Sequence, residues 1–432
     1  MKINVKNNLI YFNLFLIIML FFAQLSLRID NHILLYFSFV SILLLSAVSS
    51  KKSILLIFLF LLVDNNIFDF QGISIQYFIM IIYLFKFVFI KLKFDKKLLF
   101  WSVLFFLYSI IYYKYGGISS CIQGIKLAIM IYFFTCVFLD KDIMNIDTYK
   151  ESILYACKGI FYSILIAIIV NPSLLDSSRF SLSSDSNWNL LGIFSAIIFS
   201  HLFILWYKLH DKKTFFYLSI SFVCSLLSTS RTALLLLIIS ILWVLFFFNS
   251  TKKYLTRNIF IVLFGLLFVL LIYLNAIHIT YLDKIIDRII NPRRGDISNG
   301  RFLLWSSYIN YLKNNRMILL LGYGSPLIND SISLYNGLNL VAHNMFIEQL
   351  VMYGIIGNMI IFRMFRISYC SIKSFYFKTK SFLLEKKYII LILLVFISGF
   401  FSHILTSVLV TTELYLGIYG YLVHNNGGKE NG

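Results

Sequence analysis

Charged side chains are scarce in this sequence. Only 13% of the 432 residues are Asp, Glu, Lys or Arg, whereas 60% are hydrophobic and 18% are aromatic. A soluble domain carries about 25% charged residues, so this chain has too few to cover a folded surface exposed to water. The composition therefore excludes a soluble globular protein and predicts long segments embedded in a lipid bilayer.

Proline, patterned cysteine and the common catalytic motifs are also lacking. The three prolines, Pro172, Pro292 and Pro326, fall in segments that we place outside the membrane, so few helix kinks are expected. The five cysteines show no CxxC or Cys/His spacing. No P-loop, GxSxG, HExxH or strand–helix GxGxxG motif occurs. We therefore expect neither a metal nor another cofactor.

The charges that are present are predominantly positive, with 38 Lys and Arg against 19 Asp and Glu. In a soluble protein this surplus would suggest a nucleic-acid partner. Here most of it lies in short loops between apolar runs, where basic residues set membrane orientation or touch anionic lipid. We therefore expect contact with the lipid bilayer and none with nucleic acid.

The apolar runs predict an all-α polytopic membrane protein, a single integral membrane domain over 1–432 with about 12–14 transmembrane helices. A helix needs roughly 20 apolar residues to cross a bilayer, and the third, ninth and thirteenth runs are short enough to be half-helices. The fourteen runs are approximately 9–27, 33–49, 53–66, 73–91, 98–113, 120–139, 152–170, 188–208, 214–228, 232–249, 258–276, 341–362, 388–403 and 405–423.

Basic loops orient these helices. Because cytoplasmic loops are enriched in Lys and Arg, the side that carries the five basic loops is expected to be cytoplasmic, together with both termini. A first loop at 171–187 and a large loop at 277–340 then fall on the opposite, periplasmic side. The five basic loops are 51–52, 91–97, 208–213, 252–257 and 363–387.

The large loop contains the pattern of an amphipathic helix over residues 300–315. Phe302, Trp305, Ile309 and Leu312 recur at three- and four-residue steps. They predict an apolar edge suited to lying on the bilayer surface. The following Gly322-Tyr323-Gly324-Ser325-Pro326 predicts a turn before the next helix.

Arginines recur on the periplasmic side. Arg179 lies in the first loop, Arg231 in a tight hairpin between two apolar runs, and Arg301 at the start of the amphipathic helix. A guanidinium is a planar fork of donors that binds phosphate oxygens in pairs, so these residues suit a lipid-linked diphosphate. The alternative is that each snorkels as an interfacial anchor. Arg293 and Arg294 are either solvated loop charges that raise the local potential or further ligands.

His343 begins the apolar run after the large loop. It is a candidate general base, because an imidazole can be neutral near pH 7, or else a structural polar residue. Glu348 follows it in an otherwise apolar run. Because an acidic side chain inside a membrane is costly, we interpret Glu348 as a functional residue. Glu348 could pair with an arginine, orient His343 or cap a packing network. Weaker candidates in or near apolar runs are Lys126, Lys158, His201, His403 and Glu413.

Over roughly residues 171–360 the sequence resembles the O-antigen polymerase and O-antigen ligase superfamily. The Ser230-Arg231 hairpin and the Arg179…Asn187 loop match the usual pattern, with the asparagine open between Asn187 and Asn189. The other matching pieces are Asn299-Gly300-Arg301 with Trp305, then Leu321-Gly322-Tyr323-Gly324, then His343-Asn344 followed after nine residues by Gly354-Ile355-Ile356-Gly357.

The resemblance implies a GT-C-like membrane glycosyltransferase of the bacterial inner membrane, in lipopolysaccharide biosynthesis. It implies an undecaprenyl-diphosphate-linked glycan donor, a periplasmic active site, and neither nucleotide sugar nor metal. Family arginines engage the diphosphate, and the histidine acts at or near the acceptor hydroxyl. We therefore assign as catalytic His343, Arg301 and Arg231, and as substrate-binding Arg179, Asn187, Arg293, Arg294 and Glu348.

Three functions remain open at this point. We favour an O-antigen polymerase, whose acceptor is another lipid-linked repeat unit. The alternatives are a ligase, whose acceptor is lipid A–core, and a polysaccharide flippase or transporter. A transporter would require paired broken helices and charges near the bilayer midplane, whereas the charges here gather at one face. A chain-length regulator and a flippase are further candidate partners.

Overall fold

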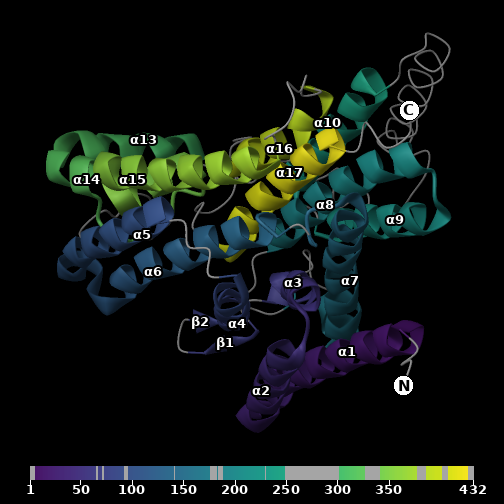
Figure 1. Cartoon of the computed structure of the whole chain (residues 1–432). Helices are drawn as coiled ribbons and strands as arrows, with labels where there is room; N and C mark the ends of the chain where they lie inside the picture. Colours follow the sequence, from purple (N-terminus) through teal and green to yellow (C-terminus); the bar gives the residue numbers. More distant parts are fainter. Residues whose placement is uncertain are drawn as a thin grey trace.

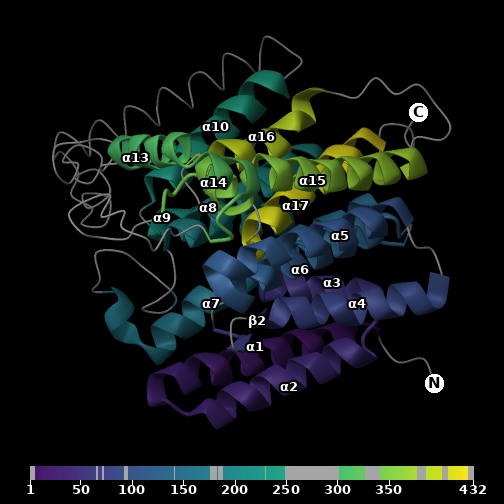
Figure 2. The ribbon, with the colours of Figure 1, turned by 90° about the vertical axis from the view of Figure 1, so that its left-hand side faces the viewer.

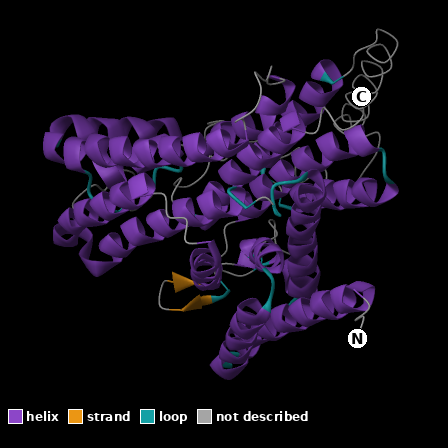
Figure 3. Cartoon of the chain, in the orientation of Figure 1, coloured by secondary structure: helices purple, strands orange, loops and turns teal. Residues whose placement is uncertain are grey.

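Apolar runs become helices almost one for one in the computed structural model. It describes residues 5–64, 67–70, 73–91, 96–140, 142–175, 182, 188–228, 230–248, 301–325, 341–376, 386–400 and 407–426. This part of the chain is almost entirely helical, as Figure 3 shows, and its one small sheet is a hairpin of β1 (Asp69–Phe70) and antiparallel β2 (Ile73–Ser74).

The helices follow one another along the chain as Figure 1 labels them. They are α1 (Val5–Ile29), α2 (His32–Val48), α3 (Lys51–Phe60), η1 (Leu62–Asp64), α4 (Ile75–Lys91), α5 (Lys96–Ser109), η2 (Ile110–Tyr112), α6 (Tyr113–Phe138), α7 (Ile146–Val170), η3 (Pro172–Leu175), α8 (Trp188–Leu209), α9 (Lys212–Leu227), α10 (Arg231–Phe247), α13 (Arg301–Asn314), α14 (Arg316–Leu321), α15 (Met345–Tyr376), η5 (Lys386–Ile389), α16 (Ile390–Gly399) and α17 (Val408–Asn426).

Polar caps explain why the helices begin where they do. The side chains of Ser50, Asn145 and Asp211 each accept a backbone N–H from the first turn of α3, α7 and α9. Such bonds satisfy donors that a helix start otherwise leaves without a partner. Because the caps stand between long apolar runs, they divide a nearly continuous hydrophobic sequence into separate helices.

Four described helices are long and apolar enough to cross a membrane. These spans are Ile10–Ile29, Ile146–Val170, Asn189–Leu209 and Met345–Ser374. Helices α3 and α16 have 10 residues each, about 15 Å, or half of the hydrocarbon core, as expected for two of the short runs. The chain is an all-α polytopic membrane protein. The apolar run at 258–276 lies outside the described residues.

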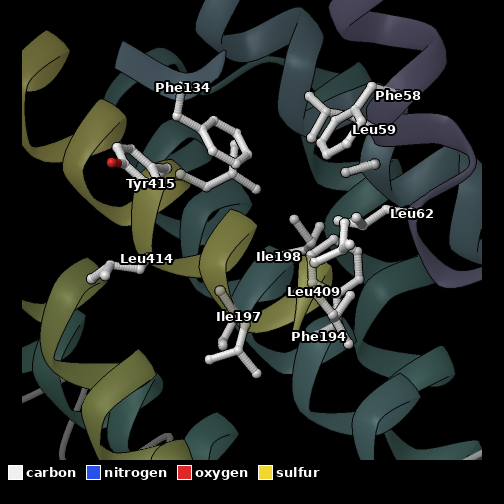
Figure 4. Packing of buried hydrophobic residues seen from close by; sticks show 14 of the residues in the cluster. Phe58, Leu59, Leu62, Phe134, Phe194, Ile197, Ile198, Leu409, Leu414 and Tyr415 are labelled. Atoms are coloured by element: carbon white, nitrogen blue, oxygen red, sulfur yellow. The ribbon is translucent and has the colours of Figure 1, made fainter. Parts of the chain in front are cut away.

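Apolar side chains from helices distant in sequence form the core. Figure 4 shows Phe58 of α3, Phe134 of α6, Ile197 of α8 and Tyr415 of α17, which belong to one cluster of buried apolar residues. All four are buried, and the rings of Phe134 and Tyr415 stack with their centres 4.5 Å apart. The core therefore ties the N-terminal helices to the last helix of the chain.

Ion pairs join several helix ends at one end of this bundle. Lys51 at the start of α3 binds Asp140 after α6, and Lys52 binds Glu151 of α7 with a separation of 2.6 Å. Lys150 of α7 in turn lies 2.9 Å from Asp211 before α9. The loops that carry Lys51-Lys52 and Asp211 therefore meet at the same end.

Helices α13, α14 and α15 lie together beside α5 and α6. Figure 1 shows this layer at one side of the molecule, and Figure 2 shows α15 running along α5 and α6, with α1 and α2 at the far edge. Helix α15 continues to Tyr376, so the predicted run at 341–362 ends too early. The additional residues of α15, from Arg363 onward, include several basic side chains. A search for apolar runs ends at the first of these charges, although the helix continues.

Candidate functional site

Arg231 is the first residue of α10, in the hairpin after α9. Ser228 and Ser230 are buried, Ser230 accepts the N–H of Ala233, and the N–H of Ser230 donates to the Ser228 hydroxyl. The structure therefore places Arg231 at the N-terminus of α10, directly after a capping serine.

Arg301 is the first residue of α13 and is partly buried. Helix α13 is held by Leu304, Tyr308 and Leu312, which pack with Val351 of α15 in one apolar cluster. The indole N–H of Trp305, one turn after Arg301, donates to the carbonyl of Ala342 at 2.8 Å. This bond places the start of α13 beside the residue that precedes His343.

The four residues of the predicted apolar edge of α13 divide between the protein interior and its outer face. Leu312 is buried and Trp305 is partly buried, but Phe302 and Ile309 are exposed, with 67% and 42% of their surface accessible. The reason is that α15 supplies the apolar partner of α13, so the helix turns Leu304 and Tyr308 inward. The exposed Phe302 and Ile309 leave the outer face free to contact lipid.

His343 lies immediately before the cap of α15, with a positive φ of 52°. This left-handed conformation is uncommon for residues other than glycine and is held by its surroundings. The N–H of His343 donates to Oε1 of Glu348 at 2.6 Å. Asn344 caps the helix by accepting the N–H groups of Phe346 and Ile347.

Glu348 is fully buried beneath this bond. The contact that the structure shows is this bond to the backbone N–H of His343, and the three roles that the sequence left open for Glu348 stay predictions. The carboxylate also acts on Tyr308 of α13: burial first, and then the negative charge of Glu348, raise the pKa of Tyr308 to about 12. The Tyr308 phenol is therefore protonated at neutral pH and packs close to the acid that holds the histidine.

The two arginines lie within electrostatic range of each other. Burial lowers the pKa of Arg301, and the positive charge of Arg231 lowers it further. Both side chains stand at the first position of a helix, where unpaired N–H groups and the helix dipole add positive potential. The structure thus places Arg231 and Arg301 within electrostatic range of each other, and the bond from Trp305 to Ala342 places the start of α13 beside the residue that precedes His343.

Two glycines lock the helix that carries His343. Gly354 breaks the regular conformation of α15, with φ 61° and ψ −174°. Next to this break, the carbonyls of Val351 and Met352 accept the N–H groups of Tyr323 and Gly324 at 2.7 and 2.9 Å. The loop that contains Gly322 is therefore held against α15 by backbone hydrogen bonds.

No side chain fits at this crossing. A Cβ at Gly322, where φ is 85°, would lie 2.5 Å from the carbonyl oxygen of Met352, and one at Gly354 would lie 2.4 Å from the N of Gly322. Tyr108 of α5 donates to the carbonyl of Leu321 at 2.8 Å, and Tyr112 donates to that of Tyr353 at 3.3 Å. The two glycine motifs thus have a structural role beneath the candidate site.

Other candidates are elsewhere or undescribed. His201 binds the Tyr149 hydroxyl, Lys158 lies over the ring of Tyr155, and Glu413 is buried within α17. Four of the predicted substrate-binding residues lie outside the described residues, as does His403: Arg179, Asn187, Arg293 and Arg294. Within the described ranges, no three His, Cys, Asp or Glu side chains are grouped to hold a metal.

Sequence reasoning named Asn344 only within the His343-Asn344 motif and did not predict that it caps a helix. That role could have been found, because an Asn directly before an apolar run is a helix-start signal. Tyr308 and the tyrosines Tyr108 and Tyr112 carried no such signal. They act across helices that are distant in the sequence, which no local pattern reveals.

A comparison with known protein families matches the region of the chain that contains the candidate site. Residues 216–362 match the family described as O-Antigen ligase. The match runs from α9 into α15 and includes Arg231, Arg301, His343 and Glu348. No curated protein and no solved structure gives a significant match to the chain.

We expect Gly322→Ala and Gly354→Ala each to lower the thermal unfolding temperature of the detergent-solubilised protein. Each added Cβ would separate α15 from the Gly322 loop, at a cost of about 1–3 kcal/mol for the strained backbone. The double variant should lose less than the sum of the two, because either Cβ alone opens the same contact. The partly exposed Ile355→Ala is the control. If the two decreases in unfolding temperature were fully additive, Gly322 and Gly354 would not act in one shared contact.

Proposed function

We propose that this chain is an O-antigen polymerase of the bacterial inner membrane. The proposal is supported by the match of residues 216–362 to the family described as O-Antigen ligase, whose members are membrane glycosyltransferase-like enzymes. The proposed enzyme transfers an undecaprenyl-diphosphate-linked glycan to a hydroxyl of another lipid-linked repeat unit. The observation that carries this proposal is the pair of arginines at neighbouring helix N-termini beside His343.

The arginines hold the diphosphate of the donor. As the bond between the anomeric carbon and the phosphate oxygen breaks, negative charge grows on the leaving diphosphate. Arg231 and Arg301, with the two helix ends, stabilise that charge in a fixed arrangement. The diphosphate is already a good leaving group, so no further activation of the donor is needed.

His343 acts on the acceptor. It removes the proton from the acceptor hydroxyl as the oxygen attacks the anomeric carbon. Glu348 and Asn344 keep its backbone in place through the hydrogen bonds at the start of α15. A single direct displacement of this kind inverts the anomeric centre. Arg179, Asn187, Arg293 and Arg294 belong to the substrate-binding part of the proposal on their sequence pattern alone.

The proposal also assigns the membrane sides. The end of the bundle with the ion pairs of Lys51, Lys52 and Lys150 faces the cytoplasm, as do both termini. The site then opens to the periplasm, where carrier-linked glycans are joined. A flippase that delivers the repeat units and a chain-length regulator are the partners that this placement implies.

A ligase is the second candidate, because the matched family bears that description. It would use the same donor site with lipid A–core as acceptor. A surface-glycan gel of a null mutant separates the candidates. Core carrying one repeat unit indicates a lost polymerase, as we expect. Bare core with polymer on the carrier lipid indicates a ligase, and unflipped cytoplasmic repeat units indicate a transporter.

We expect His343→Ala and Arg301→Ala to abolish long-chain polysaccharide at unchanged protein level. Loss of a general base slows a reaction by about 10²–10⁴-fold, and loss of a charge-stabilising donor by about 10²–10³-fold. The readout is the same gel, with immunoblots for protein amount. Matched controls are the exposed His32→Ala and Arg316→Ala, the latter also at a helix start. Chains of normal length in either site variant would remove that residue from the mechanism.

We expect Arg231→Lys to fail as well. Lysine keeps the charge but is a point donor without the planar fork that grips two phosphate oxygens. The variant should accumulate normally in the membrane and yield short glycans on the gel. Full chain length with lysine would reduce Arg231 to an electrostatic anchor.

A further inference from the structure

Residues that border three of the five basic loops meet at one point of the bundle. Lys208 lies in the last turn of α8, Phe248 caps the end of α10, and Lys387 lies in η5. The elements that carry them pack together with α16 and α17, as Figure 1 shows. The proposed mechanism uses none of these residues. The three loops are 208–213, 252–257 and 363–387.

The ring of Tyr388 in η5 lies at the centre of this meeting point and is buried. The ring of Phe248 meets it edge-on, with the two ring centres 5.3 Å apart. The imidazole of His424 in α17 stacks on it with a centre distance of 4.8 Å and an angle of 9° between the planes. Tyr388 is therefore held between the ends of α10 and α17.

Two ammonium groups converge on this ring. Nζ of Lys387 lies 5.3 Å from the ring centres of both Tyr388 and Phe248, and Nζ of Lys208 lies 5.9 Å from the ring centre of Tyr388. An aromatic ring attracts a cation at such distances, whereas two ammonium groups beside the same ring repel each other. An anion bound to both lysines would offset that repulsion.

The backbone around Lys387 is held in place as well. The indole N–H of Trp243 in α10 donates to the carbonyl of Lys387 at 2.8 Å, and the Tyr207 hydroxyl of α8 donates to the carbonyl of Phe248 at 3.1 Å. A lysine that only orients a helix or snorkels to the surface needs no such positioning. Lys208 is exposed and Lys387 is partly exposed, so an anion can reach both.

Exposed apolar side chains flank the two lysines. Leu209 follows Lys208, Ile389 follows Tyr388, and Phe247 stacks on Trp243 with ring centres 4.2 Å apart. A soluble anion gains nothing from apolar neighbours, whereas the acyl chains of a phospholipid pack against them. Tryptophan and tyrosine are also typical of the depth at which lipid headgroups lie. These surroundings favour a lipid as the source of the anion.

We propose that Lys208 and Lys387, positioned by Tyr388 and Trp243, form a binding site for the phosphate of an anionic phospholipid. Each ammonium has three donors, so it can stay beside the ring and still donate a charge-assisted hydrogen bond to a phosphate oxygen. The site lies at the end of the bundle with the ion pairs, since Asp211, which pairs with Lys150, follows Lys208 by three residues. It goes beyond the proposed function and does not depend on it.

Native mass spectrometry of the purified full-length protein in detergent tests this site. The probe is dioleoyl phosphatidylglycerol, and the Kd of the first bound lipid is measured. It should bind more tightly than dioleoyl phosphatidylcholine, which has the same chains but no net charge. Lys387→Gln should weaken its binding roughly tenfold, the scale of one hydrogen bond to a charged group. Lys208→Gln should weaken it about fivefold, the effect of one lysine near an anionic surface.

Matched controls separate this site from the general positive charge of the loops. Lys212→Gln removes an exposed lysine from the same basic loop as Lys208, and it should bind within about twofold of wild type. Lys387→Arg keeps the charge and the ring contact, so it should also bind within about twofold. Trp243→Phe leaves the net charge unchanged but removes the donor to the Lys387 carbonyl, so it should weaken binding. Because Lys208 is exposed, Lys208→Gln should fold normally.

Three outcomes would overturn the site. The first is equal affinity of the wild-type protein for the two lipids. The second is a loss of affinity in Lys212→Gln as large as that in Lys208→Gln. The third is displacement of the bound phosphatidylglycerol by inorganic phosphate at an equal concentration, which would assign the two lysines to a soluble anion.

Discussion

The repulsion between Arg231 and Arg301 is the constraint on which the rest of the site depends. Two positive groups in a partly buried site raise each other's free energy, and here two helix N-termini add to the potential. The fold places both at helix starts, Arg231 after a buried serine hairpin and Arg301 on the helix that packs on α15. A bound anion would offset their mutual repulsion, which supports the proposed diphosphate donor over an uncharged one.

The position of His343 follows from backbone hydrogen bonds more than from its own side chain. Its left-handed conformation is held by Glu348 from within α15 and by the Trp305 bond to Ala342 from α13. Farther along, the break at Gly354 frees carbonyls that the Gly322 loop satisfies. The histidine, the arginine of α13 and the glycine motifs therefore belong to one connected network. A substitution at Gly322 or Gly354 would therefore shift His343 and Arg301 together.

The sequence sufficed for features that depend on local chemistry. Apolar runs predicted the helices, and Arg231, Arg301 and His343 stood out as candidates because charged and titratable side chains are rare in this chain. Features that depend on a distant partner were not predictable. The inward face of α13 is decided by α15, and the length of α15 beyond 362 by a basic segment that hydropathy ignores.

Donor and acceptor of a polymerase carry the same diphosphate, so the phosphate alone cannot tell them apart. Discrimination must come from the part of each molecule that differs in position, which is the saccharide reaching toward His343. In the proposed polymerase, a diphosphate site with Arg231 and Arg301 would recognise every carrier-linked glycan equally. Separate sites for charge and for sugar would let the glycan specificity change while the diphosphate chemistry stays fixed.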